Sequence, residues 1–457
     1  MNETKWRDPV IFWLMVYLLL IPFDGLFRVV ALKTNVFWIN GWKDLLLLII
    51  LYVGFAATFF NAGQIRQRVR FPSPLLTASL FLLGIYGIAY GTIIKSISFA
   101  QGLWAFKIFY LPVMLFVLVQ IYPANLKNDF PEKILRKLML LSVPIVFFGV
   151  WQFFAGWQKV SLLFLDTEAI GGEYVRISTI GGFLRAFSTL RDSFTFGDYC
   201  SMLFIFSCGR LLFAKSLGRF SRMYPFVLLA GIIASTSRVS LITAGYGFLL
   251  LIFFKMPFRQ NTKKVTLLFL MACFFCALLT LTYYLAYYYT DPRLKSEFLS
   301  SFLGTSSVQP RFIEWEEVLK KYPLNNLSTF LLGWGTGVVG ATQKKFVTHY
   351  FFIDNFYLLM LIMFGVAGLS LWLTYILRSV WKLVDYVTGK YNRSSVEFWF
   401  VAGTAAYILS QFVEFLFRTG LEGFPGQIYF WVFLGLALRV VSLTKNSEPV
   451  NKKVGAL

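Results

Sequence analysis

The sequence predicts an all-α protein that crosses a membrane about twelve times. Three observations lead to this fold class. Of the 457 residues, 58% are hydrophobic and 14% are charged, and the mean hydropathy is +0.67, whereas about a quarter of the residues of a soluble domain are charged. The apolar residues form segments of about 20, the length of a helix that spans the hydrocarbon core. Basic residues gather in alternate connections between those segments.

Each predicted helix is an apolar segment with charged residues, glycine or proline near its ends. The first follows Lys5 and Arg7 and has no small-residue cleavage site behind it, so we expect a retained membrane helix rather than a signal peptide. Twelve segments fit the required length of about 20 residues: roughly 9–30, 43–60, 73–92, 100–121, 137–156, 196–214, 223–236, 238–255, 265–288, 355–377, 397–416 and 427–443.

The connections on one side of the predicted membrane are all basic: 61–72, 122–137, 215–222, 256–264, 378–396 and the C-terminal tail. Cytoplasmic loops carry an excess of Lys and Arg, so these loops and both termini are predicted to be cytoplasmic. One helix more or fewer would destroy the alternation, which supports the predicted number of helices. The net charge of +21 is therefore a signal of membrane topology, and nucleic-acid binding is not expected.

The opposite side carries two long connections, about 157–195 and 289–354, and several short ones. Long loops usually carry function, so the second is predicted to be an extracytoplasmic catalytic loop. There is no internal repeat, and residues 1–457 are predicted to form a single integral membrane domain. All four cysteines lie in apolar segments, which indicates core residues rather than a disulfide framework.

The second long connection is the densest source of groups able to do chemistry. It holds Arg311, the only histidine, His349, and Asp354. The run RFIEWEEVLKK has apolar residues at helical spacing and predicts a short amphipathic helix that ends near Pro323. The glycine-spaced GWGTGVVG follows; its backbone N–H groups could face a phosphate, although a plain loop turn is the simpler interpretation.

Two arginines are candidates for binding a diphosphate. Arg238 stands in STSRVS at the outer mouth of a predicted helix, where a guanidinium among hydroxyl groups could clamp a pyrophosphate. The alternative is an arginine that snorkels at a helix end. Arg311 opens the amphipathic helix, where the helix dipole mildly disfavours a cation, so it could serve a ligand. The alternative is a solvated arginine near Glu314.

Other outer residues have weaker signals. Arg185 and Arg191 could attract an anionic head group to the vestibule, or could be isolated loop arginines. His349 or Asp354 could take a proton from a sugar hydroxyl, while Asp354 could equally be the cap of the next helix. Glu414 and Arg418 are spaced i,i+4 and are predicted to pair with one another.

Four stretches follow one another on the predicted outer face: RAFSTLRDSFTFGDY, STSRVSLITAGYGFLLL, the run from RFIEWEEVLKKYPL to LLGWGTG, and DNFYLLMLIMFGVAGL. Together they resemble the motifs of the bacterial O-antigen ligase and O-antigen polymerase superfamily. The correspondence lies in an arginine-bearing loop before a helix, a Ser-Arg motif that begins a helix, an arginine with a Trp-containing helix and a Gly-x-Gly turn, and the opening of the next helix. The motifs span about residues 181–370.

The resemblance implies a GT-C-like fold and a metal-independent, inverting glycosyltransferase without a cofactor. The two arginines that are essential in this superfamily match Arg238 and Arg311. The implied donor is a glycan on undecaprenyl diphosphate, and the acceptor is another glycan or lipid A core. In ligases a histidine usually stands at the position of Asp354, and here His349 lies five residues earlier. This departure leaves the identity of the base open and favours a polymerase over a ligase.

The expected substrate-binding residues are Arg185, Arg191, Gly335, Asn355 and Tyr357. The expected location is the bacterial cytoplasmic (inner) membrane, with the site on its extracytoplasmic face and in contact with membrane lipid and other polysaccharide-assembly proteins. A lipid-linked oligosaccharide flippase or transporter is the alternative from another class, because twelve helices are common there. A passive subunit of a glycan-export machine is a third.

Overall fold

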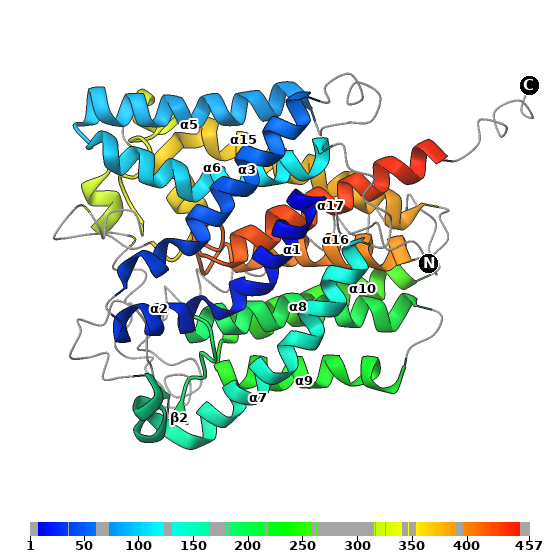
Figure 1. Ribbon diagram of the computed structural model, residues 1–457. Helices are drawn as coiled ribbons and strands as arrows, with labels where there is room; N and C mark the ends of the chain where they lie inside the picture. Colours follow the sequence, from blue (N-terminus) through cyan, green and yellow to red (C-terminus); the bar gives the residue numbers. More distant parts are fainter. Residues whose placement is uncertain are drawn as a thin grey trace, which may run out of the picture.

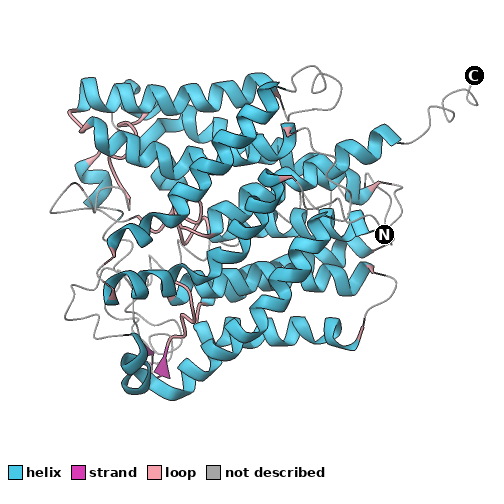
Figure 2. Ribbon diagram, viewed as in Figure 1, coloured by secondary structure: helices cyan, strands magenta, loops and turns pink. Residues whose placement is uncertain are grey.

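Long helices run side by side through the whole molecule, and a short hairpin lies at one end (Figure 1). This computed structural model describes residues 8–34, 36–60, 73–122, 130–164, 179–180, 183–214, 218–256, 262, 315, 317–324, 326–340, 346, 353–389 and 396–447. Figure 2 shows that helix dominates this part of the chain, as the sequence predicts.

The helices and strands follow one another along the chain as α1 (Pro9–Leu20), the 3-10 turn η2 (Ile21–Phe23), α2 (Asp24–Lys33), the 3-10 turn η3 (Phe37–Gly41), α3 (Trp42–Phe60), α5 (Pro74–Lys95), α6 (Phe99–Ile121), α7 (Phe130–Phe164), β1 (Thr179–Ile180), β2 (Phe183–Leu184), α8 (Ser193–Phe213), α9 (Arg219–Ser235), α10 (Arg238–Lys255), α14 (Leu327–Leu332), α15 (Phe356–Thr388), α16 (Val396–Glu414) and α17 (Gly426–Ser447). The two strands pair antiparallel, with Thr179 opposite Leu184.

Within the described residues, 9 helices are long and apolar enough to cross a membrane, and the apolar helix Phe220–Ser235 is shorter. This confirms an all-α polytopic membrane protein. The exact number of spans stays a prediction, as do the cytoplasmic termini and the identity of the membrane. The predicted helix at 265–288 lies outside the described residues, as do the connection 61–72 and most of the connection 256–264 and of the C-terminal tail.

Two helices extend beyond their predicted ends. Helix α7 was expected to stop at 156, but it continues to Phe164 after a break at Gly156, whose φ is 72°. Glycine adopts this left-handed backbone without a steric penalty, so the chain turns there and resumes a helix in the predicted first outer loop. Helix α15 runs to Thr388, into the connection predicted to be cytoplasmic.

Two groups of helices share the core. Helix α8 packs against α9, α10 and α16, while α6 packs against α5 and α17. Helices α15, α16 and α17 pack against one another and join the groups, around the fully buried rings of Trp372, Trp399 and Trp431. Helix α3 at the edge instead exposes large apolar side chains such as Tyr52 and Phe60. An apolar exterior of this kind suits contact with lipid.

Helix α15 is broken at Gly365, whose φ is 66°, and a loop inserts against the break. The N–H of Trp334 donates to the carbonyl of Ile362 at 2.8 Å, and the N–H of Gly335 donates to Met363 at 3.0 Å. A break in an apolar helix leaves carbonyl groups without their helical partners, which is costly away from water. The inserted loop supplies the missing donors, so the break and the loop depend on each other.

Candidate functional site

The junction between α9 and α10 lies where several segments distant in sequence meet. The segment after β2 reaches it through the N–H of Ala186, which donates to the carbonyl of Ala234 at 3.0 Å. The turn after α16 reaches it through Arg418. Figure 1 places β2 and α2 at one end of the bundle, whereas α17 ends at the other. The basic connections predict the end with the hairpin to be extracytoplasmic.

The junction is a strained turn. Thr236 has a φ of 51°, which is uncommon for a β-branched residue. A residue held in the left-handed region costs about 1–2 kcal/mol, and such strain persists only where neighbouring groups hold it. Here the hydroxyl of Thr236 accepts a hydrogen bond from Nε of Arg185 at 2.8 Å. The next residue, Ser237, is the N-cap of the helix that begins at Arg238.

Ser237 is the N-cap of α10 and the centre of a hydroxyl network. Its Oγ accepts from the N–H of Ser240 at 3.3 Å and shares a 2.6 Å hydrogen bond with the Ser240 hydroxyl. Ser240 Oγ donates in turn to Oδ1 of Asp198, on the second turn of α8, at 2.7 Å. Gly197 allows this close approach, because a Cβ there would lie 2.6 Å from Ser240 Oγ. The serines therefore join α8 to the first turn of α10.

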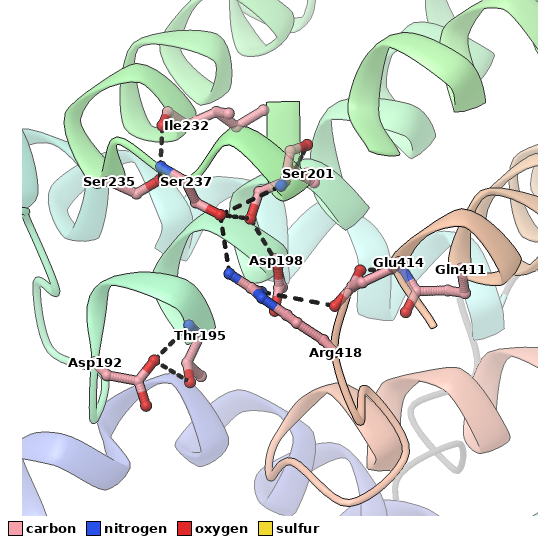
Figure 3. Close-up of polar contacts among 11 residues, drawn as sticks. Asp192, Thr195, Asp198, Ser201, Ile232, Ser235, Ser237, Gln411, Glu414 and Arg418 are labelled. Carbon is pink, nitrogen blue, oxygen red and sulfur yellow. Dashed lines mark hydrogen bonds and ion pairs between the residues drawn. The ribbon is translucent and has the colours of Figure 1, made fainter. Parts of the chain in front are cut away.

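Arg418 completes the network from the turn after α16. Its Nη1 lies 2.5 Å from Oδ2 of Asp198, and its Nη2 donates to Oγ of Ser237 at 2.9 Å (Figure 3). Glu414 forms a longer ion pair at 3.7 Å. Burial alone lowers the pKa of the Arg418 guanidinium, but the carboxylates of Asp198 and Glu414 raise it above its ordinary value. Arg418 therefore stays charged in its half-buried position.

Phe194 supports two of these arginines at once. The guanidinium carbons of Arg185 and Arg418 each lie 4.4 Å from the centre of its ring. Cation–π contacts of this length are attractive and leave the edges of a guanidinium available for hydrogen bonds. The first turn of α8 therefore carries both an aromatic support and, at Asp198, a carboxylate partner. Arg185, predicted to bind substrate, lies over this ring and donates to the hydroxyl of Thr236.

Arg238 is the first residue of α10 and is exposed to solvent. The structure places it directly after the restrained Ser237, at the predicted outer end of the bundle. Arg191, also predicted to bind substrate, lies half-buried just before Asp192, the cap of α8. Arg311 and His349 lie outside the described residues, so their approach to Arg238 stays a prediction.

The start of α15 differs from expectation in one respect. The cap is Asn355, whose Oδ1 accepts from the N–H of Leu358 at 2.9 Å, and not Asp354. An N-cap needs a β-region backbone and a side-chain oxygen that reaches the N–H two or three residues on, and Asn355 meets both conditions. Asp354 is half-buried one residue earlier. Its role as cap is therefore excluded, and its role as a base stays a prediction.

Asn355 and Tyr357 were expected to bind substrate, and the structure uses both to hold α15 against the end of α16. Nδ2 of Asn355 donates to the carbonyl of Leu416 at 3.1 Å, and the hydroxyl of Tyr357 donates to Phe412 at 2.9 Å. These bonds place the start of α15 beside the turn that carries Arg418. The two residues therefore help to position the turn after α16, and with it Arg418, through contacts between α15 and α16.

Gly335 was expected to offer its backbone to a phosphate. Its N–H instead donates to the carbonyl of Met363, and a Cβ added to it would lie 2.5 Å from Cα of Gly91. Its φ of 102° is also one that other residues rarely adopt. The loop around Gly335 is therefore a tightly packed turn, in line with the simpler of the two interpretations.

Two residues of the network were missed by sequence reasoning. Asp198 stands in an apolar helix, and a carboxylate there is a signal of function that could have been followed. Arg418 was expected to pair with Glu414; this ion pair is present, but the shorter contact is with Asp198. Among the described residues, no group of three or more His, Cys, Asp or Glu side chains could hold a metal ion.

The fold and the network define a multi-pass α-helical membrane protein with a partly buried ionic cluster at one end of its bundle. No protein-family model matches the chain, and no curated protein matches it.

Proposed function

We propose that the protein is a glycosyltransferase that uses an undecaprenyl-diphosphate-linked glycan as donor and another glycan as acceptor, at the outer face of the cytoplasmic membrane. One observation carries the proposal: an exposed arginine, Arg238, directly follows a strained turn that is held from three sides. Strained backbone that the surrounding structure restrains is concentrated at functional sites. The resemblance of the chain to polysaccharide polymerases and ligases supplies the substrate class.

In the proposed reaction, the guanidinium of Arg238 binds the diphosphate of the donor and offsets the charge that develops on it as the sugar leaves. A guanidinium suits this task because it is always charged and presents its N–H groups in a planar fork. The first turn of α10 adds a favourable helix dipole for an anion. Arg311 is the second arginine of the proposed site.

The acceptor hydroxyl attacks the anomeric carbon in line, with inversion, and loses its proton to His349 or Asp354. Asp354 is half-buried one residue before the cap of α15, and the helix start is held by Asn355 instead. Polymerisation is the favoured outcome because Asp354 stands where ligases usually have a histidine. Transfer to lipid A core is the alternative acceptor reaction.

The direct test is incubation of the purified full-length protein with an undecaprenyl-diphosphate oligosaccharide, with and without chelator, followed by size analysis of the glycans. Longer glycans are expected in both samples. A shift of the whole oligosaccharide to lipid A core, when that acceptor is added, would identify a ligase instead. If neither glycan product forms, the proposed activity is wrong.

A second candidate, transport of a lipid-linked sugar, is favoured by the break in α15 at Gly365. Discontinuous helices with inserted loops form the substrate sites of many transporters. In proteoliposomes, a transporter would move a labelled undecaprenyl-diphosphate oligosaccharide between leaflets without lengthening it. The ionic network favours the enzyme, because it lies at the start of α10, whereas the substrate sites of transporters lie near the middle of the bilayer.

A further inference from the structure

We propose that Arg418 is a positioning residue for the proposed glycosyl transfer: it holds Ser237, and through Ser237 it sets the place from which Arg238 reaches the donor diphosphate. The inference rests on the proposed function, and it assigns a role to an arginine outside the loops that the sequence singled out. It is carried by the contacts that Arg418 makes on three segments of the chain.

Arg418 directs its hydrogen-bonding groups at the protein itself. Nη1 lies 2.5 Å from Asp198, Nη2 donates to Ser237, and the side chain is only 11% exposed. One face also lies against the ring of Phe194. A diphosphate would have to displace these partners to bind Arg418. The residue therefore acts on Arg238 through protein contacts and is not itself a ligand.

Ser237 connects Arg418 to the start of α10. The same oxygen that accepts from Arg418 also caps the helix at Ser240. The residue before it, Thr236, is in a conformation that is unfavourable without support. Loss of Arg418 removes one of the restraints on this turn and leaves Arg185 and the serine network. The first turn of α10, and Arg238 with it, is then held less tightly, because only the serine network still joins it to α8.

Charge provides a second, independent reason. Arg418 faces two carboxylates: that of Asp198, which is 24% exposed, and that of Glu414, which is 3% exposed. With the guanidinium gone, the negative charge of Asp198 would lie beside the turn where the diphosphate is proposed to bind. Like charges at short range in a partly buried site repel strongly, so donor affinity should fall.

The experiment compares the steady-state kinetics of the full-length wild type with Arg418→Gln, Arg418→Lys and the neutral pair Asp198→Asn/Arg418→Gln. The donor, an undecaprenyl-diphosphate oligosaccharide, is varied at saturating acceptor. In Arg418→Gln, we expect KM for the donor to rise about tenfold or more, as for loss of a hydrogen bond to a charged group, together with a lower kcat. Arg418→Lys keeps the charge but not the fork, so its KM should be intermediate.

The neutral pair separates charge from geometry. It lacks the unpaired carboxylate of Asp198, the more exposed of the two that face Arg418, so its KM should lie below that of Arg418→Gln but above that of the wild type. Arg439→Gln is the matched control: Arg439 is another half-buried arginine, bonded to the carbonyls of Val119 and Tyr122 away from the network, and its loss should leave KM unchanged.

An unchanged donor KM in Arg418→Gln overturns the inference whatever happens to kcat, because partial unfolding lowers the amount of active enzyme without changing KM. Should Arg418→Gln fail to fold, Arg418→Lys and the neutral pair decide in the same way: a raised KM supports the positioning role, and an unchanged KM overturns it. If the wild type lengthens no glycan, the proposed function falls and the inference falls with it.

Discussion

Arg418 and Asp198 are 220 residues apart in the sequence, yet Nη1 of the arginine lies 2.5 Å from Oδ2 of the carboxylate. This ion pair joins the turn after α16 to α8, and through Ser237 it reaches the start of α10. Because the pair is partly buried, removal of one partner leaves an uncompensated charge. The end of the bundle that carries Arg238 is therefore sensitive to residues that have no direct contact with a substrate.

Replacement of Arg238 by alanine should lower turnover by about 10²-fold or more, the loss expected when one group that stabilises developing charge is removed. Arg238→Lys should retain part of the activity, because it keeps the charge but not the planar fork. The measurement is glycan elongation by the purified variants. Lys255→Ala, at the other end of α10, is the control and should behave as wild type. Wild-type turnover in Arg238→Ala would remove this residue from the site.

The stability of Thr236 variants should depend on whether each substitution relieves the strain of this turn. Thr236→Val keeps the branched side chain but removes the acceptor of the Arg185 hydrogen bond, at a cost of about 1.5–3 kcal/mol. Thr236→Gly loses the same bond but relieves about 1 kcal/mol of backbone strain. We therefore expect melting temperatures in detergent in the order wild type, Thr236→Gly, Thr236→Val. A glycine variant less stable than the valine variant would contradict the role assigned to strain.

Gly335→Ala should destabilise the protein by about 2 kcal/mol or more, because its Cβ would overlap the backbone of Gly91 and the residue holds a φ of 102°. Thermal unfolding in detergent measures the loss. Gly245→Ala is the matched control, since a Cβ there meets nothing within 4 Å inside a helix. It should be neutral, or more stable by about 0.5–1 kcal/mol. Equal stability of the two variants would show that the loop is not tightly packed against α5.

The base can be assigned by comparing His349→Asn with Asp354→Asn. One of the two should lower turnover by about 10²–10⁴-fold, as expected for loss of a general base, and the other should have a small effect. Because Asn355 rather than Asp354 caps α15, Asp354→Asn should leave the cap of that helix intact. Full activity in both variants would show that neither is the base.

Each of the two contacts of Asn355 should contribute to the stability of the protein. Asn355→Asp keeps a capping oxygen and loses the donor to Leu416, whereas Asn355→Ala loses both. The alanine variant should be less stable than the wild type by about 1 kcal/mol from the cap alone, and the aspartate variant should lie between them. Thermal unfolding of the three proteins gives the order, and a least stable aspartate variant would contradict it.

The fold class and most of the helices could be predicted because hydrophobicity is a property of contiguous segments. The segments near 43–60, 100–121 and 238–255 agree closely with α3, α6 and α10. The end of α7 could not be predicted in the same way, because Gly156 interrupts the helix without ending it. A glycine alone does not reveal whether the chain resumes a helix beyond it. Helix α15 continues past residue 377 through Arg378, Lys382 and Asp385, charged residues that hydrophobicity alone assigns to a connection.

The sequence by itself determined that this is a helical membrane protein, which end of its bundle is predicted to face outward, and that Arg238 begins a helix there. These features follow from hydrophobicity and charge counted along the chain. Only the tertiary structure decided that Asp198, Ser237 and Arg418 meet, that Asn355 caps α15, and that Gly335 is packed against α5. Such contacts depend on which helices lie side by side, and packing between distant segments leaves no periodic pattern in the sequence.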